Sequence, residues 1–331
     1  MSDYALNPNL FSDKEDKDPI RAGFGRGLKA LGETNESVVG LCADLTESTQ
    51  MHLFAEAFPD RFIETGIAEQ NLVTVASGLA RAGKIPFAAS YAAFSPGRNW
   101  EQIKTTCAIN NQPVKIIGAH AGLYTGPDGA THQMLEDIAL MRVMPNMVVI
   151  APGDSVEAEK ATRALADNGK LSYLRLARAK TVVFSTPESP FEIGKAYVLR
   201  AGSDVSLLGT GTMTYQLLVV AKLLEEQGIN AEVVHVPTVK PLDEETIISS
   251  IRKTGRAVTA EEAQIKGGFG GAVAELLGDK LPTPLLRLGV DDRYGESGDP
   301  DELIEHFGLT GVKMLDKIQE FINNMPQYHK D

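Results

Sequence analysis

The chain has 331 residues, of which 43% are apolar and 23% are charged, and its formal net charge is −12. This length allows two domains with separate cores, and the composition is that of a globular protein. The negative charge argues against nucleic acid or an anionic membrane as a partner, because both need a basic face. A phosphorylated substrate stays possible, since a few local Arg and His side chains can hold a phosphate.

The cysteines and the N-terminal segment indicate a soluble protein of the cytoplasm. Cys42 and Cys107 form no CxxC pair, so neither a disulfide framework nor a structural zinc site is expected. The stretch SDKEDKD (12–18) lacks the apolar core of a secretory signal. No apolar run is long enough to span a membrane.

Strand and helix signals alternate through the first half of the chain, after a polar N-terminal arm over 1–19. Buried strands are predicted where β-rich runs end in turn residues, at 37–45, 86–90, 114–120 and 147–153. A helix is predicted over 66–83, closed by Gly83. Asp154 and Glu157 have the spacing of a capping box, which predicts a further helix up to Asn168.

The second half of the chain repeats this alternation. Its predicted strands lie at 204–211, 231–236, 256–262 and 284–290. Strands separated by helix-length segments indicate parallel sheets with helices on both faces. The stretch 181–194 has two prolines and no helical period, and it is the best candidate for a linker. We therefore predict two doubly wound α/β domains, at 20–185 and 186–331.

Glu69, in the segment GIAEQN (66–71), is the first candidate for chemistry. It shares one helical face with five apolar residues, so its carboxylate should project along the buried side of the helix. Those five residues are Leu72, Val73, Ala76, Leu79 and Ala80. The alternative is a first-turn glutamate that the helix N-terminus stabilises, and spacing alone favours this alternative.

The loop HAGLYTGPDGATHQ (120–133) is the second candidate. It follows a predicted strand, and open α/β sheets bind ligands beyond the carboxyl ends of their strands. We favour a substrate loop over a metal site, because His120 and His132 have no third strong ligand nearby. A polar loop whose histidines cap backbone groups is the structural alternative. Tyr91 and Phe94, at the end of another predicted strand, have a spacing that is usual for core packing.

Taken together, these segments resemble the C-terminal half of transketolases over nearly the whole chain. They are most similar to the form in which that half is a separate polypeptide. The resemblance rests on an ordered set of motifs: CADL (42–45), GIAEQN, the 120–133 loop, MRVMPNM (141–147), YLRLAR (173–178), PLDEE (241–245), EE (261–262) before GGFGG (267–271), and LGVDDRYGESGDP (288–300). It implies a pyrimidine-binding domain over 20–185, and over 186–331 a transketolase C-terminal domain that mainly packs subunits together.

The resemblance implies transfer of a two-carbon ketol unit from a ketose phosphate to an aldose phosphate, with thiamine diphosphate as cofactor. Glu69 would hydrogen-bond N1′ of the cofactor's aminopyrimidine and so promote loss of the proton at C2 of its thiazolium. A carboxyl group on an apolar face suits this role, because burial disfavours its charged form. Phe94 would stack on the aminopyrimidine, with Tyr91 as the neighbouring aromatic and Asp44 close to the cofactor.

The resemblance also implies roles toward the substrate. Asp128 would read a hydroxyl of the ketose donor, and His132 would lie near its C1 hydroxyl and carbonyl, so that both join Glu69 in the catalytic set. One departure is Gly97, where many fused transketolases have Tyr, which predicts a more open pocket floor. Guanidinium, imidazole and hydroxyl groups suit the oxygens of a sugar phosphate, and the resemblance assigns that task to Arg21, Ser48, His120 and Arg178.

The family's diphosphate and metal site needs a GDG motif followed by Asn, and this chain has no such motif. It also offers no oxygen cluster suited to Mg²⁺, so we expect no metal ligand in this chain. Mg²⁺ or Ca²⁺ and the diphosphate would be bound by an N-terminal transketolase subunit. The expected assembly is an α2β2 heterotetramer, in which each cofactor lies between a partner's domain and this pyrimidine domain.

Two related enzymes provide alternative interpretations. The C-terminal part of 1-deoxyxylulose-5-phosphate synthase shares GIAEQ and the DGxTHQ pattern, but pyruvate as donor would not need Arg21, Ser48 and His120. The β subunit of a 2-oxo-acid dehydrogenase has the same two domains, but should have another loop in place of GPDGATHQ. A catalytically silent scaffold is disfavoured by the full set of polar residues. We prefer a transketolase subunit that serves the pentose phosphate pathway or a fixation cycle.

Overall fold

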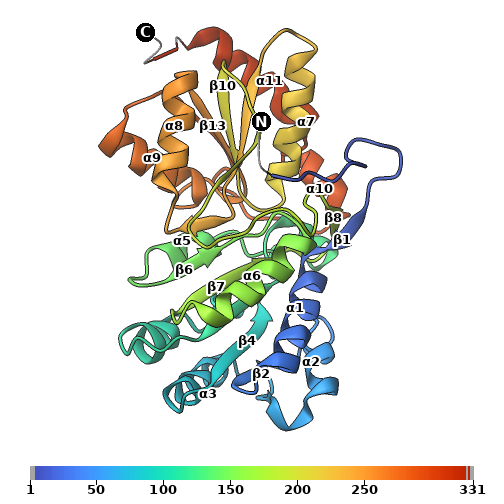
Figure 1. The fold of residues 1–331 in the computed structure, drawn as a ribbon, viewed down its shortest axis with the longest axis vertical. Helices are drawn as coiled ribbons and strands as arrows, with labels where there is room; N and C mark the ends of the chain where they lie inside the picture. Colours follow the sequence, from blue (N-terminus) through green and yellow to red (C-terminus); the bar gives the residue numbers. More distant parts are fainter. Residues whose placement is uncertain (1–3, 326, 329–331) are drawn as a thin grey trace.

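Two β-sheets, each covered by helices, organise the computed structural model, which describes residues 4–325 and 327–328 (Figure 1). The first sheet fills the lower half of Figure 1 and the second the upper half. Both sheets are mainly parallel, so the predicted α/β class is confirmed. The outermost residues of the predicted arm and domain, 1–3 and 329–331, lie outside the described residues. Within the described part, no helix has the length and apolar character needed to cross a membrane.

Seven strands form the first sheet in the order β12-β6-β7-β5-β4-β2-β3, and only β12 runs antiparallel to its neighbour. The four strands predicted in the first half of the sequence are all present, as β2, β4, β5 and β6. They are mostly buried, as expected for a parallel sheet that is covered on both faces. The strands are β2 (Val38–Cys42), β3 (Phe62–Glu64), β4 (Ile85–Tyr91), β5 (Lys115–Ala119), β6 (Val148–Ile150), β7 (Ser172–Leu176) and β12 (Thr238–Lys240).

Helices cover both faces of the first sheet. Phe87 of β4 packs in one core cluster with α1 and α6, whereas the next residue, Ala88, packs in another with α3. The helices α1 and α6 lie side by side (Figure 1), so close that a Cβ on Gly23 would overlap the carbonyl group of Ser155. The elements are α1 (Ile20–Thr34), α2 (His52–Ala57), η1 (Pro59–Arg61), α3 (Glu69–Arg81), α4 (Trp100–Gln102), η2 (Ile103–Ala108), η3 (Leu123–Asp128), α5 (Asp137–Arg142) and α6 (Ser155–Asp167).

Five strands form the second sheet in the order β14-β13-β10-β11-β9, with β9 antiparallel to β11 and the others parallel. The strands predicted in the second half of the sequence are present as β10, β11, β13 and β14. The elements are β9 (Tyr197–Arg200), β10 (Val205–Gly209), α7 (Met213–Glu225), β11 (Ala231–His235), α8 (Glu244–Thr254), β13 (Ala257–Gln264), α9 (Phe269–Lys280), β14 (Leu285–Val290), α10 (Pro300–His306) and α11 (Gly311–Asn324).

The start of α6 connects the two halves of the molecule. The Asp154 carboxylate accepts the Glu157 N–H at 3.0 Å, which confirms the predicted cap. The Glu157 carboxylate accepts the Gly153 N–H at 2.6 Å and contacts the His235 ring of β11 at 2.7 Å. Asp154 therefore caps α6, and Glu157 joins the start of α6 to the second sheet.

The N-terminal arm packs along the predicted linker. Its strand β1 (Lys17–Pro19) pairs antiparallel with β8 (Lys180–Val182). The Tyr215 hydroxyl of α7 donates a hydrogen bond to Glu15 at 2.7 Å. The N-terminal arm thus contacts both the linker and the second half of the chain. The strand β12 lies after the predicted boundary at residue 185, yet it forms the edge of the first sheet.

Candidate active site

The predicted site residues gather where the strands β7, β5, β4 and β2 end. These four strands are consecutive neighbours in the sheet, and they are parallel. Their carboxyl ends therefore meet at one edge, which is where open α/β sheets bind ligands. The residues that follow them include Asp44 after β2, Tyr91 at the end of β4, His120 after β5 and Arg178 after β7. Topology brings together segments that lie far apart in the sequence.

Four rings form the centre of this edge. Tyr91 stacks on His120 with 3.7 Å between the ring centroids and 26° between the planes. Phe94 lies 6.0 Å from Tyr91 and meets the His132 ring edge-on at 5.3 Å. Tyr91, Phe94 and His132 keep part of their surfaces exposed. The end of β4, the turn after it and the loop at 120–133 thus present a partly exposed aromatic platform.

Glu69 begins α3 and is only 2% exposed, with its helical face packed as predicted. Its Oε2 accepts a hydrogen bond from Nη1 of Arg98 at 2.7 Å, and the Arg98 guanidinium lies over the Phe94 ring at 4.6 Å. The described residues donate no hydrogen bond to the other carboxylate oxygen, Oε1. Sequence reasoning missed Arg98, whose position four residues after Phe94 was the only available signal. The carboxylate, the arginine and the ring form one contiguous group.

The segment before Glu69 is fastened to the Asp44 turn by a residue that sequence reasoning also missed. Oε1 of Glu64, at the end of β3, accepts the N–H groups of Asp44 at 2.7 Å and Gly66 at 3.0 Å. Its Oε2 accepts the Thr46 hydroxyl at 3.0 Å. Asp44 has a φ of +58° and an exposed side chain. Glu64 therefore holds in place the two turns that lead to Asp44 and Glu69.

Two arginines, Arg21 and Arg178, form a cationic group beside the rings. Arg21 donates through Nε to the carbonyl of Arg178 at 3.3 Å and through Nη1 to the carbonyl of Ser48, while Arg178 donates to the carbonyl of Thr125 at 2.9 Å. Burial and the charge of Arg178 lower the pKa of Arg21. Among the described residues no carboxylate lies within ion-pair distance of either guanidinium. Such a group is suited to an anion that enters from outside.

His120 lies at the junction of the rings and the arginines. Its Nδ1 is buried without a hydrogen-bond partner in the described part of the chain. Burial, and then the charges of Arg21 and Arg178, lower the pKa of His120 to about 2. The imidazole is therefore neutral at pH 7, with one ring N–H to donate. A neutral N–H that donates to an ionised phosphate oxygen still forms a charge-assisted hydrogen bond, so the role predicted for His120 does not need a charged ring.

This pKa shift predicts how stability depends on pH. A histidine whose folded pKa lies below its unfolded value of about 6.5 contributes stability above that pH, and this stability is lost as the pH falls toward the folded pKa. His120→Phe keeps a ring against Tyr91 and does not titrate. Urea unfolding at pH 7, 6 and 5 should show the parent losing stability relative to the variant, by up to about tenfold in folding equilibrium constant per pH unit. Parallel pH profiles would contradict the burial of a neutral His120.

The remaining predicted residues lie at the rim of this edge. Asp128 is exposed at the end of η3, and Ser48 is partly buried in the loop after β2. A Cβ on Gly97 would overlap the carbonyl oxygen of Ala93, so this turn has no room for any side chain. The more open pocket floor that Gly97 implies stays a prediction. The described residues hold no group of three or more His, Cys, Asp or Glu residues that could bind a metal.

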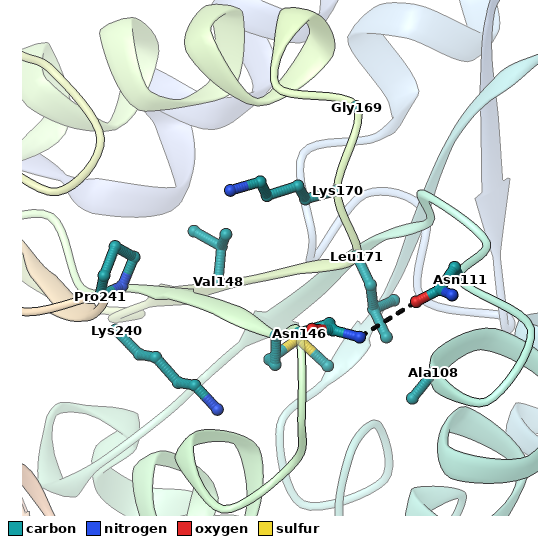
Figure 2. A pocket seen from close by; sticks show the side chains of 10 residues that line it. Ala108, Asn111, Asn146, Val148, Gly169, Lys170, Leu171, Lys240 and Pro241 are labelled. Carbon is teal, nitrogen blue, oxygen red and sulfur yellow. Dashed lines mark hydrogen bonds between the residues drawn. The ribbon is translucent and has the colours of Figure 1, made fainter.

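A pocket of about 390 Å³ lies elsewhere on the first sheet (Figure 2). Its lining includes Val148 at the start of β6, Leu171 just before β7, and Lys240 at the end of the antiparallel β12. Asn146 donates to Asn111 across its floor at 3.1 Å. It therefore lies at the amino ends of the parallel strands, away from the site, and none of the predicted site residues lines it.

Comparison with known proteins identifies the two halves. The transketolase pyrimidine-binding domain matches residues 17–182, and the transketolase C-terminal domain matches residues 194–314. A Methanocaldococcus jannaschii protein described as a transketolase C-terminal section is 44% identical over 91% of this chain and 95% of its own length. A 6-deoxy-6-sulfo-D-fructose transketolase subunit of Clostridium sp. is 42% identical over 87% of this chain and 89% of its own length.

Solved structures and longer enzymes agree with this identification. A split-gene transketolase, described as an inactive β4 tetramer, superposes with a TM-score of 0.86 at 42% identity, over 92% of this chain and 98% of that one. The transketolase of Campylobacter jejuni superposes with a TM-score of 0.78 at 25% identity, over 95% of this chain and 49% of that one. The 1-deoxy-D-xylulose-5-phosphate synthase of Crocosphaera subtropica is 37% identical, and this chain spans about half (48%) of its length.

Proposed function

Since this chain belongs to the transketolase family and corresponds to its C-terminal part, we propose that it is one subunit of a two-chain transketolase. The assembled enzyme would transfer a two-carbon ketol unit from a ketose phosphate to an aldose phosphate. The observation that carries this proposal is that a buried carboxylate, an open aromatic platform and an arginine pair without a carboxylate partner lie at one edge of one sheet. A cofactor ring and a phosphorylated substrate need these groups side by side.

The site fits the pyrimidine half of thiamine diphosphate. Phe94 and Tyr91 offer partly exposed ring faces, and Glu69 lies next to them with one oxygen that accepts no hydrogen bond from the described residues. Glu69, Phe94 and Tyr91 would hold the aminopyrimidine, with Asp44 nearby. When bound, the cofactor supplies the carbon nucleophile that accepts the ketol unit. Glu69 would hold and exchange a proton at Oε1, and the rings would exclude water from it.

The loop at 120–133 and the arginine pair would bind the sugar. Asp128 and His132 would contact hydroxyl and carbonyl groups of the donor, and the Thr131 hydroxyl fixes the His132 ring through Nδ1 at 2.8 Å. The phosphate would be held by Arg21, Ser48, His120 and Arg178. A phosphate beside two guanidinium groups forms short charge-assisted hydrogen bonds, which the free cluster lacks.

An N-terminal subunit is part of this proposal. It would bind the cofactor's diphosphate through Mg²⁺ or Ca²⁺, in an α2β2 assembly. The similar split-gene chain that is inactive as a β4 tetramer supports this dependence, as does the similar Clostridium protein, which is described as a subunit. We further propose the domain boundaries 20–185 and 186–331. A cytoplasmic location is consistent with two free, buried cysteines.

The 37% identity to a deoxyxylulose-phosphate synthase supports a second candidate function. In that case the donor would be pyruvate, whose carboxylate would leave as CO₂, and the remaining two-carbon unit would be joined to the aldehyde carbon of an aldose phosphate. Assays of the assembled enzyme with pyruvate and with a ketose phosphate separate the two candidates. We expect turnover with the ketose phosphate, and exclusive use of pyruvate would overturn the transketolase proposal.

Phosphate binding can be separated from chemistry by the choice of donor. If Arg21, His120 and Arg178 hold the phosphate, the Ala variant of each should lose more catalytic efficiency with a ketose phosphate than with hydroxypyruvate, which has no phosphate. The expected difference is about 1.5–3 kcal/mol for each charge-assisted bond. Arg26→Ala is a matched control on the same helix, because Arg26 pairs with Asp18 and Glu159 instead. Equal losses on both donors would contradict the assignment.

A further inference from the structure

The loop at 120–133, here called the substrate loop, is held by residues of the second half of the chain. Oε1 of Glu262, on β13, accepts the N–H of Tyr124 at 2.6 Å. Its Oε2 accepts the Thr212 hydroxyl at 2.8 Å, and Thr212 precedes α7. A Cβ on Gly122 would overlap the Glu262 carboxylate. One buried carboxylate thus joins the backbone of the substrate loop to β13 of the second sheet and to the turn before α7.

Further contacts reach the substrate loop from the segment before α10. Gln133 donates through its amide to the carbonyl of Gly126 at 3.0 Å and to the carbonyl of Glu296 at 2.8 Å. A Cβ on Gly126 would come within 2.9 Å of Pro300, and one on Gly129 would overlap the Ser297 hydroxyl. Both glycines have positive φ angles of +75° and +74°. The loop that carries His120, Asp128 and His132 is therefore shaped on one side by C-terminal residues.

The charge of Arg175 stabilises the ionised Glu262 carboxylate, but it does not offset the free-energy cost of burying that carboxylate. Arg175 of β7 donates to the Glu262 carbonyl at 2.8 Å and pairs with Asp137 at 2.9 Å, and Asp137 also accepts the Tyr173 hydroxyl at 2.7 Å. Burial raises the pKa of Glu262 to about 7 against the opposing effect of Arg175, and Asp137 adds a further rise. A fully buried carboxylate is costly unless its oxygens are well bonded. The two hydrogen bonds of Glu262 supply that bonding, and one of them goes to the substrate loop.

We propose that Glu262 is a positioning residue through which the C-terminal domain sets the conformation of the substrate loop. The C-terminal domain then shapes substrate recognition, in addition to packing subunits together. The structural half of this proposal concerns contacts within the chain alone. Its consequence for substrate rests on the proposed function, since the roles of His120, Asp128 and His132 belong to that proposal.

The neighbouring residue, Glu261, is a matched control. It lies on the same strand, is equally buried, and burial likewise raises its pKa to about 7. Its carboxylate accepts the N–H groups of Phe269 at 2.7 Å and Gly270 at 2.8 Å, at the start of α9. A substitution at Glu261 therefore removes a similar buried carboxylate without touching the substrate loop.

Amide hydrogen exchange of the full chain, followed by mass spectrometry, tests the structural half. Glu262→Met removes both acceptors while keeping the length of the side chain, and should raise exchange at Tyr124 by at least about tenfold. Glu261→Met should raise exchange at Phe269 and Gly270 and leave Tyr124 protected. Unchanged protection of Tyr124 in Glu262→Met, or equal opening of the loop in both variants, would overturn the proposal. If Glu262→Met does not fold, Thr212→Val loosens the same carboxylate and is judged by the same readout.

Kinetics of the assembled enzyme test the consequence for substrate. Glu262→Met should raise KM for fructose 6-phosphate by about tenfold and leave the affinity for thiamine diphosphate within twofold. Glu262→Gln keeps an acceptor for the Tyr124 N–H, so its KM should return most of the way to the parental value. If Glu262→Met opens the substrate loop but leaves KM for fructose 6-phosphate unchanged, Glu262 has no role in substrate recognition. If the enzyme shows no ketol transfer at all, the proposed function fails, and the exchange experiment still decides whether Glu262 holds the loop.

Discussion

Replacement of Glu69 by alanine should slow exchange of the C2 hydrogen of thiamine diphosphate at least about a hundredfold in the assembled enzyme. The physical reason is that Glu69 is a buried carboxylate at the start of α3, adjacent to the proposed ring platform of Phe94. Glu69 is linked to this platform through Arg98, which donates to its carboxylate and lies over the Phe94 ring. The measurement is hydrogen–deuterium exchange at C2, followed by acid quenching and NMR.

A control variant and an assembly check show whether a slower exchange in Glu69→Ala comes from the lost carboxylate or from a damaged structure. Glu101→Ala removes an exposed carboxylate of α4, which accepts a hydrogen bond from the Gln102 amide, and should leave the exchange rate unchanged. Assembly of the Glu69 variant can be checked by sedimentation. Exchange at the parental rate in an assembled Glu69→Ala enzyme would remove this residue from the mechanism.

Local patterns in the sequence predict much of this edge of the sheet. The apolar face shared by Glu69 and Leu72 indicates that the carboxylate lies on the buried side, as the structure has it, because a regular helix places both on one side. Spacing alone still favours the alternative of a first-turn glutamate, and the resemblance is needed to assign Glu69 a function. The β-rich run at 114–120 predicts a strand with the histidine loop beyond its carboxyl end, and β5 has that form. Turn residues mark the ends of most predicted strands. These features depend on spacing within one element, which the sequence displays directly.

Partners from distant segments could not be predicted in this way. The bond between Arg98 and Glu69 depends on how the turn after β4 folds back over α3. Glu262 and Tyr124 lie 138 positions apart in the sequence. The pair Glu261–Glu262 on one strand does not show which of the two carboxylates contacts the first half of the chain. The neutral state of His120 depends on burial together with two arginines from other elements. Such contacts follow from tertiary packing.

The chain alone should show no ketol transfer, and an added N-terminal subunit should restore it. In the proposed site, Glu69 and a pair of rings would contact one end of the cofactor only. Ile67, two residues before Glu69, is 75% exposed, as expected for a surface that a partner covers. Activity should rise with added partner and saturate near one partner per chain. Full activity of the purified chain without a partner would contradict the split site.

Calorimetry of thiamine diphosphate binding to this chain alone, with Mg²⁺ present, tests the split site most directly. Stacking one small ring and making one or two hydrogen bonds does not offset the loss of ligand freedom on binding, so the expected Kd is weaker than about 1 mM. The same titration with the N-terminal subunit present should give tight, Mg²⁺-dependent binding at about one cofactor per chain. Tight, Mg²⁺-dependent binding to this chain alone would contradict the account.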